Sequence, residues 1–363
     1  MHLYLHIPFC ESKCFYCAFT SLKADESTKR AYFAALFQDL RFHFDKLGVN
    51  FGEINSLFIG GGTPSSMDFR LFAPIFDFLS PYLADDCECS IEANPFSSNL
   101  AWLENMRGYG INRLSFGAQS FDEKKLKFLG RIHSPKDIFK SLENAINTGF
   151  ANINVDMIYD TKFDTKKMLK FELENLARLA KMGLTHISAY HLTLEKGTAF
   201  EKRANFKKNA PNLMRFFIKG IENLGFSHYE VSNFAKAKNK ICKHNLAYWQ
   251  GANYLGCGLS AVSFYAKSRF YTHKSLAGYL KEPIFRRVEP LSERDLLLEH
   301  LFLGLRSIVG VDENRLNFAQ KERAFLLSKH GKLRYEKNSN AQNGRFFSTN
   351  FLLADEITLF LSE

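Results

Sequence analysis

The sequence lacks long hydrophobic runs, since no apolar stretch reaches the roughly 18 residues that a helix needs to cross a bilayer. It also lacks low-complexity tracts, internal repeats and blocks of about five or six like charges. The first residues show neither a basic leader nor a small-residue cleavage site, so we expect no signal peptide. These absences argue against a membrane-spanning, fibrous or disordered chain.

The composition is that of a globular protein, with 46% hydrophobic and 24% charged residues among 363. A chain of this length forms one large domain or about two. The 48 Lys and Arg residues exceed the 38 Asp and Glu residues, which leaves a net charge of +10. Because the lysines are scattered and form no aromatic-basic stripe, we interpret the excess as a solvated surface and expect no nucleic-acid partner.

Short apolar segments alternate with segments of helical periodicity along most of the chain. The predicted strands are 2–7, 54–59, 87–92, 111–117, 152–158 and 185–192. The predicted helices are 26–47, 68–83, 99–109, 135–148, 165–182 and 212–224. This alternation indicates βα units around a parallel sheet. Six units are too few for a closed eight-stranded barrel, so we predict an α/β fold with a partial, open (βα)6 barrel related to the TIM barrel.

One face of the later strands carries polar side chains and the other carries apolar ones. The polar face holds Glu88, Ser90, Glu92, Ser115, Gly117, Gln119, Asn152, Asn154, Asp156, His186, Ser188 and Tyr190. Ordinary barrel interiors are filled by branched apolar side chains, so this pattern predicts an interior that holds a ligand and water. A flat sheet with one solvated face is the alternative, although helices after every strand argue against it.

The strand–helix alternation stops past residue 270. We therefore predict a first domain over 1–274 and a small helical domain over 275–363 that resembles a winged helix. The polar stretch from Asn338 to Gly344 has turn chemistry and is predicted to be the tip of a hairpin wing.

Three of the seven cysteines lie within eight residues, directly after the first predicted strand: Cys10, Cys14 and Cys17. A C-x3-C-x2-C loop supplies three thiolates, which fits three irons of a 4Fe–4S cluster and leaves the fourth iron open. Zinc is the alternative, and it needs a fourth ligand. Cys87 and Cys89 lie on the predicted helix-facing side of a strand, where we expect them to be buried small hydrophobic residues. An odd number of clustered cysteines is typical of a reducing compartment, so we predict a cytoplasmic protein.

The motif HIPFCESKCFYC at 6–17 resembles the radical S-adenosylmethionine superfamily, in the branch that contains the oxygen-independent coproporphyrinogen III dehydrogenases and the HemW-type heme chaperones. The similarity extends over nearly the whole chain. It covers 58–65, 90–95, 110–122, 129–133, 153–159, 186–198, 228–236, 244–249, 254–264 and 303–312.

The resemblance implies that the open iron binds the amino and carboxylate groups of S-adenosylmethionine, whose C–S bond is cleaved to a 5′-deoxyadenosyl radical. The implied cofactor contacts are Tyr4, Tyr16, Gly61, Gly62, Thr63, Glu92, Gln119, Arg131 and Asp156. Their residue types suit this task, because carboxylates bind ribose hydroxyls and a sulfonium, and an arginine fork binds a carboxylate. The glycine motif at 60–64 is not a phosphate loop, since no Gly-Lys-Ser/Thr follows it.

Two features favour the heme chaperones within this branch. No fourth cysteine follows Cys17, and the motif begins at residue 10, which we interpret as leaving no room for a substrate-binding extension. In the chaperones the segment at 244–249 is associated with heme, so the resemblance implies His244 as a ligand of heme iron, with Cys242 as a thiolate alternative. The chain departs from the family's Gly-Leu-Pro turn at 160–162, where it reads Asp-Thr-Lys.

We therefore expect a heme chaperone that binds a 4Fe–4S cluster, S-adenosylmethionine and heme and delivers heme to heme proteins such as respiratory enzymes. The resemblance also leaves room for a homodimer and for transient membrane association through the acceptor. The alternative is an active coproporphyrinogen III dehydrogenase, so the sequence leaves open whether the protein is an enzyme. A zinc-bearing nucleic-acid module is a third hypothesis.

Metal analysis tests the cysteine motif directly. Protein prepared without oxygen should contain iron and inorganic sulfide, and Cys10→Ala should abolish the visible absorption of thiolate-bound iron. Zinc without iron, or a Cys10 thiol that alkylates freely in the prepared protein, would contradict the cluster.

Overall fold

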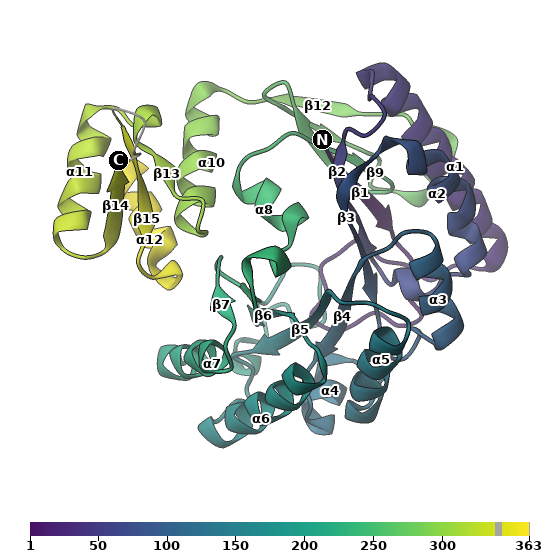
Figure 1. The fold of residues 1–363 in the computed structure, drawn as a ribbon, viewed down its shortest axis with the longest axis horizontal. Coiled ribbons are helices and arrows are strands. Elements are labelled where there is room, and N and C mark those ends of the chain that lie inside the picture. The colour runs from purple at the N-terminus through teal and green to yellow at the C-terminus, as the bar shows by residue number, and fades with distance from the viewer. Residues whose placement is uncertain (338–342, 363) are drawn as a thin grey trace.

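The computed structural model describes residues 1–337 and 343–362. Six parallel strands form the centre of its large sheet (Figure 1). They are β1 (His2–Ile7), β2 (Ile54–Gly61), β3 (Leu83–Ala93), β4 (Arg113–Gln119), β5 (Ile153–Tyr159) and β6 (His186–His191). Each strand pairs in parallel with the next, and within the described residues the sheet does not close. The predicted α/β fold with an open (βα)6 barrel is confirmed.

Helices follow the strands on the outer face of the sheet (Figure 1). They are α1 (Glu26–Leu47), α2 (Ala73–Leu79), α3 (Leu100–Gly108), α4 (Glu123–Leu129), α5 (Pro135–Asn147), α6 (Lys166–Met182) and α7 (Pro211–Asn223). Side-chain caps begin several of them; for example, Ser134 and Asp137 form a capping box at the start of α5. The sequence pattern missed α4, a helix of only seven residues. No described helix is both long and apolar enough to span a bilayer.

Short strands that the sequence did not reveal extend both edges of the sheet. They are β7 (Ser227–His228), β8 (Asn233–Ala235), β9 (Tyr254–Cys257), β10 (Val262–Tyr265), β11 (Ser268–Tyr271) and β12 (Arg287–Pro290). Only β9 among them runs parallel to its central neighbour, β1. Between β8 and β9, helix α8 (Lys243–Trp249) lies on the inner face of the sheet, opposite α1–α6 (Figure 1).

The last part of the chain has a hydrophobic core of its own. It contains α10 (Glu293–Leu305), β13 (Val311–Asp312), α11 (Phe318–Lys329), β14 (Leu333–Lys337), β15 (Gly344–Ser348) and α12 (Ala354–Ser362). β14 and β15 form an antiparallel pair, but the predicted wing tip at 338–342 lies outside the described residues. The division between 1–274 and 275–363 stays a prediction. Helix α9 (Leu276–Lys281) packs on α1 and β12 pairs with β11, so the large sheet reaches past residue 274.

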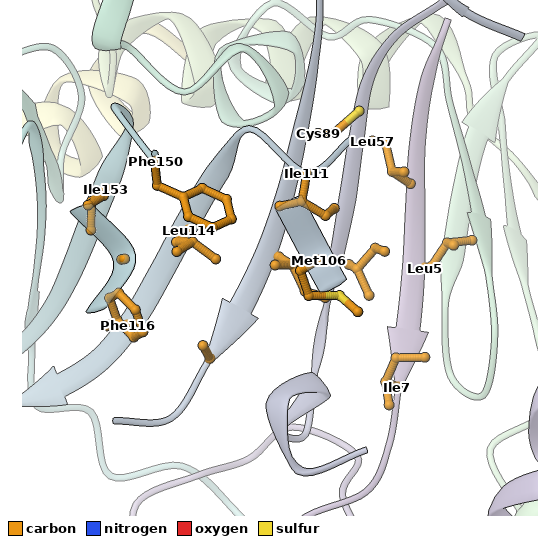
Figure 2. Close-up of a cluster of buried hydrophobic side chains, with 14 of the residues drawn as sticks. Leu5, Ile7, Leu57, Cys89, Met106, Ile111, Leu114, Phe116, Phe150 and Ile153 are labelled. Atoms are coloured by element: carbon orange, nitrogen blue, oxygen red, sulfur yellow. The ribbon is translucent and has the colours of Figure 1, made fainter. Parts of the chain in front are cut away.

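The outer face of the central strands forms the main core, with Leu5, Leu57, Leu114 and Ile153 wholly buried (Figure 2). Cys89 lies among them at 3% exposed, as expected of a small hydrophobic residue. Burial on this face accounts for the apolar alternation along the strands.

The inner face is polar, buried and hydrogen-bonded. The amide of Asn154, which is 1% exposed, donates to Ser115 Oγ at 2.7 Å and to Asp156 Oδ1 at 2.8 Å. Its carbonyl oxygen accepts from Ser188 Oγ at 3.1 Å and lies 2.7 Å from His186 Nδ1. Buried polar groups are stable only when they are paired in this way, so the alternative of a flat, solvated face is wrong.

A buried carboxylate ties α1 to the edge of the sheet. Asp39 is wholly buried, and its oxygens accept from Arg286 at 2.6 Å, from the Tyr279 hydroxyl at 2.9 Å and from the Gly258 amide at 3.0 Å. Removing this carboxylate would leave the Arg286 guanidinium without its partner in a dry environment.

We expect Asp39→Ala to lower the free energy of unfolding by about 3–5 kcal/mol, because it strands a buried charge. Asp45→Ala is the matched control in the same helix; its side chain is exposed, so a change within about 0.5 kcal/mol is expected. Urea unfolding followed by circular dichroism measures both. Equal effects of the two substitutions would reject the assigned role of Asp39.

Candidate functional site

The three motif cysteines lie in one loop at the carboxyl end of β1. The loop is closed at its base, where the Cys10 amide donates to the Leu22 carbonyl at 3.1 Å and the Leu22 amide donates to the Pro8 carbonyl at 2.8 Å. The Cys17 amide donates to the Cys14 carbonyl at 3.2 Å. None of the three thiols forms a disulfide with a described residue, and all three residues are partly exposed. The structure therefore presents three soft donors on one short segment, as the sequence predicts.

The glycines at the end of β2 allow this strand to pack closely against the start of the cysteine loop. The Gly62 amide donates to the Ile7 carbonyl, and the Thr63 amide donates to the Phe9 carbonyl, both at 2.8 Å. A Cβ atom on Gly62 would lie 2.6 Å from the Phe9 carbonyl oxygen. Gly61 has a φ of 118°, and a Cβ atom there would lie 2.6 Å from the His6 ring. Only glycine fits at either position.

Two side chains contact the thiols from neighbouring loops. The Thr63 hydroxyl donates to Cys10 Sγ at 3.4 Å. Arg131, which follows α4, donates through one terminal nitrogen to Cys14 Sγ at 3.2 Å and through the other to the Gly117 carbonyl at 2.6 Å. A cation at this position stabilises a thiolate over a thiol. The Nε atom of Arg131 is buried and has no partner among the described residues.

These residues fit an iron–sulfur cluster in their chemistry. They supply three thiols, one buried cation and one open hydrogen-bond donor. Burial raises the pKa of Cys10 and of Cys17, and the Thr63 hydroxyl opposes the rise at Cys10. Within 1–337 and 343–362, however, no three Cys, His, Asp or Glu side chains already converge as a metal-binding group. The loop holds the donors, and their convergence on a metal stays a prediction.

Two carboxyl groups face the interior of the sheet, Glu92 near the end of β3 and Asp156 in the middle of β5. Glu92 accepts from the Gly61 amide at 3.0 Å, and burial, aided by the charge of Asp156, raises the pKa of Glu92 to about 7. Asp156 accepts from Asn154 and Ser115, and burial raises its pKa as well. Burial disfavours the ionised form of both carboxyl groups, and a positively charged ligand would stabilise that form.

The structure places the other predicted cofactor contacts at different depths. Gln119, at the end of β4, has a φ of 66° and is 7% exposed, a strained backbone of the kind that collects at functional sites. Tyr16, within the cysteine loop, packs against the hydrophobic cluster that contains Leu129 and Phe200. Tyr4 lies on the inner face of β1, where its hydroxyl is 2.9 Å from His6 Nδ1 and its ring stacks on Phe58. Contact of these residues with the cofactor stays a prediction.

His244, the predicted heme ligand, is 1% exposed at the start of α8. Its Nδ1 lies 2.9 Å from Ser56 Oγ and its Nε2 lies 2.8 Å from the Tyr248 hydroxyl, so both ring nitrogens are engaged. Burial lowers the pKa of His244 to about 3 and keeps the ring neutral. Cys242 is wholly buried too, and burial raises its pKa to about 12. Neither side chain presents a free donor atom in this conformation, so heme ligation by His244 stays a prediction that requires one of these contacts to break.

Sequence reasoning missed the residues that hold this segment in place. Glu88 accepts from the Cys242 thiol at 3.3 Å and from the Lys243 and His244 amides at 3.0 and 3.2 Å. Arg113 is 2% exposed; burial lowers its pKa, but nearby acidic groups such as Glu88 outweigh this effect and raise it. Strand alternation put Glu88 on the inner face, but no sequence signal linked it to a segment 154 residues away.

The unusual turn at 160–162 is part of the support of the cysteine loop. Asp160 has a φ of 65°, and the Thr161 amide donates to Asp164 at 2.7 Å. The Lys162 ammonium lies 4.5 Å from the ring centre of Phe206 and 4.8 Å from that of Phe128, in favourable cation–π positions. These rings pack with Phe200, which in turn faces Phe15 of the cysteine loop.

Comparison with known proteins agrees with this arrangement. The model of the radical SAM superfamily matches residues 4–171. The solved structure of coproporphyrinogen III oxidase (HemN) from Escherichia coli, a radical SAM enzyme, superposes with a TM-score of 0.80 over 99% of this chain and 89% of that chain. At 22% identity this likeness shows the shared fold. The fold and the cysteine loop thus define the class of radical SAM proteins.

Similarity to curated proteins identifies the family within this superfamily. The heme chaperone HemW of Bacillus subtilis is 32% identical over 333 residues, which cover 88% of this chain and 86% of the relative. HemW of Mycobacterium tuberculosis is 30% identical, with 98% and 93% covered, and HemW of Escherichia coli is 34% identical, with 72% and 69% covered. The chain belongs to the HemW family of the radical SAM superfamily.

The raised pKa of Glu92 predicts that the affinity for the cofactor depends on pH. Since its pKa is about 7, the carboxyl is mostly neutral near pH 6 and mostly ionised near pH 8. S-adenosylmethionine is cationic at its sulfonium, so its affinity should rise with pH across this range by up to about tenfold. Equilibrium dialysis of the cluster-loaded protein measures it. Glu92→Gln should flatten the profile, whereas Glu104→Gln, exposed on α3, should leave it unchanged; a profile that persists in Glu92→Gln would reject the assignment.

Proposed function

We propose that this protein is a cytoplasmic heme chaperone that binds a 4Fe–4S cluster, S-adenosylmethionine and heme and passes heme to heme proteins such as respiratory enzymes. The observation that carries the proposal is the match to relatives named heme chaperone HemW, which extends over 72–98% of this chain. A homodimer and transient membrane contact through the acceptor belong to the same proposal.

Cys10, Cys14 and Cys17 would hold the cluster, which when bound supplies an electron and an open iron to S-adenosylmethionine. Arg131 would keep positive charge beside Cys14, and Thr63 would donate to Cys10, so both residues stabilise the thiolate form.

Glu92, near the carboxyl end of β3 where barrel sites are built, and Asp156, on the inner face of β5, would place negative charge near the ribose and sulfonium of the cofactor. Gly61 and Gly62 would leave room for its amino group, and Gln119 would present a polar side chain of either hydrogen-bonding character. Tyr4 and Tyr16 would contact the cofactor from β1 and from the cysteine loop.

His244 would reach heme iron only after α8 releases one of its ring nitrogens. The contact at Nε2 is the easier one to break, because rotation of the Tyr248 side chain releases it while Ser56 of β2 still holds Nδ1. Nε2 is therefore the atom that we assign to iron. Tyr248 and Trp249 would then offer flat apolar surface to the macrocycle.

Heme titration of matched variants tests this assignment. His244→Ala should weaken heme binding by about tenfold or more, because a metal ligand is lost. Tyr248→Phe removes the hydroxyl that occupies Nε2 but keeps the ring, so heme affinity should stay equal or increase. If both substitutions lower the melting temperature and neither changes heme affinity, His244 only secures α8.

A product assay distinguishes the chaperone from the alternative, a coproporphyrinogen III dehydrogenase. The solved structure of coproporphyrinogen III oxidase shares the fold of this chain. Anaerobic, reduced protein supplied with S-adenosylmethionine and coproporphyrinogen III should form no protoporphyrinogen. Transfer of bound heme to an apo heme protein is the positive readout of the same preparation, and formation of protoporphyrinogen would overturn the proposal.

A further inference from the structure

We propose that a cavity at the amino ends of β3, β4 and β5 binds a small dianion, either a phosphate group or a dicarboxylate. The cavity has a volume of about 320 Å³. The cysteine loop lies at the carboxyl ends of the parallel strands, so the two sites are at opposite ends of the sheet. The cavity is lined by Asp86, Cys87, Glu88, Arg107, Asn112, Gly149, Ala151, Asn152, Lys238, Asn239, Lys240, Ile241 and Lys243.

Positive charge dominates this lining. Arg107 comes from α3, and Lys238, Lys240 and Lys243 come from the segment that leads into α8. Against these four cations stand two carboxyl groups, those of Asp86 and Glu88. A concave surface with one excess sign of charge concentrates the field and attracts ions of the opposite sign.

The acceptors in the cavity wall are largely engaged. The oxygens of Glu88 accept from the Cys242 thiol and from two backbone amides of the α8 segment, and the Lys243 ammonium contacts Asp86 at 2.6 Å. The side chain of Asn112 spans the backbone of β3, since it accepts from the Cys89 amide and donates to the Cys87 carbonyl. Within the described residues the second oxygen of Asp86 and the amide oxygen of Asn239 remain free acceptors, but Lys243 already neutralises the charge of Asp86.

Two of the four cations are already committed, since Lys240 donates to the Ala151 carbonyl at 2.7 Å and Lys243 to Asp86, but other donors of the lining are open. Among the described residues Lys238 and Asn239 have no side-chain hydrogen bond or ion pair, and the amide nitrogen of Asn152 has none either. Arg107 makes one long hydrogen bond, to the Ile111 carbonyl at 3.4 Å. A guanidinium, an ammonium and two amide groups with uncommitted N–H bonds are the partners that phosphate and carboxylate oxygens require.

Size and lining restrict the ligand further. The volume is at the lower end of the range of about 300–1,000 Å³ for small-molecule sites. No aromatic side chain lines the cavity, so it offers no stacking surface to a porphyrin or a nucleobase. A compact ion with two negative charges satisfies the charge, the donors and the volume together.

Isothermal titration of the full-length, cluster-loaded protein with inorganic phosphate and, separately, with malonate tests the site. We expect saturable binding of one ion per chain at low ionic strength, weaker in high salt. Lys238→Gln should weaken binding severalfold, and Arg107→Gln with Lys238→Gln by about tenfold. Lys329→Gln, an exposed lysine on α11, is the control and should change nothing.

The two titrants distinguish the ligand classes: tighter phosphate indicates a phosphate ester, and tighter malonate indicates a dicarboxylate. Lys238 is exposed and, within the described part of the chain, makes no side-chain hydrogen bond or ion pair, so its substitution should leave circular dichroism and melting temperature unchanged. If neither ion saturates the protein at millimolar concentration, or if binding is equal in Lys238→Gln, the double variant and the wild type, the proposal is overturned.

Discussion

The close approach of the glycine turn after β2 to the cysteine loop is the constraint on which the candidate site depends. Backbone hydrogen bonds from Gly62 and Thr63 hold the beginning of the loop, and no side chain fits between the two segments. The same turn positions the Thr63 hydroxyl at Cys10 and directs the Gly61 amide to Glu92. One contact between neighbouring strands thus sets the positions of a thiol, a hydroxyl and a carboxyl.

The polar interior of the sheet is a second requirement, because a barrel interior tolerates polar groups only when they are paired. Asn154 joins three strands through its amide, and Glu88 secures the segment that carries His244. The interior is therefore divided: the carboxyl ends carry groups that remain available to a ligand, and the amino ends carry groups that fix α8. The basic cavity adjoins the groups that fix α8, and Lys243 both lines the cavity and bonds to Glu88 through its amide.

Much of the fold could be predicted because it rests on local periodicity. All six central strands and most of the covering helices agree with the sequence pattern, since burial on one face imposes alternation on strands and a repeat near 3.6 residues on helices. The short edge strands β7–β12 could not be found in this way, because two to four residues carry no period. For α4, seven residues with three buried positions gave too weak a signal.

Sequence by itself determined the class of chemistry: the spacing of Cys10, Cys14 and Cys17 depends only on the chain, and so does the placement of Glu92 and Asp156 on the inner face. Tertiary structure alone decided how Arg131 meets Cys14, why Gly62 must be glycine, and that both ring nitrogens of His244 are engaged. The physical reason is the separation along the chain between the residues that interact. Periodicity and motif spacing are properties of neighbours along the chain, whereas hydrogen bonds across 117 or 188 residues exist only once the sheet has assembled.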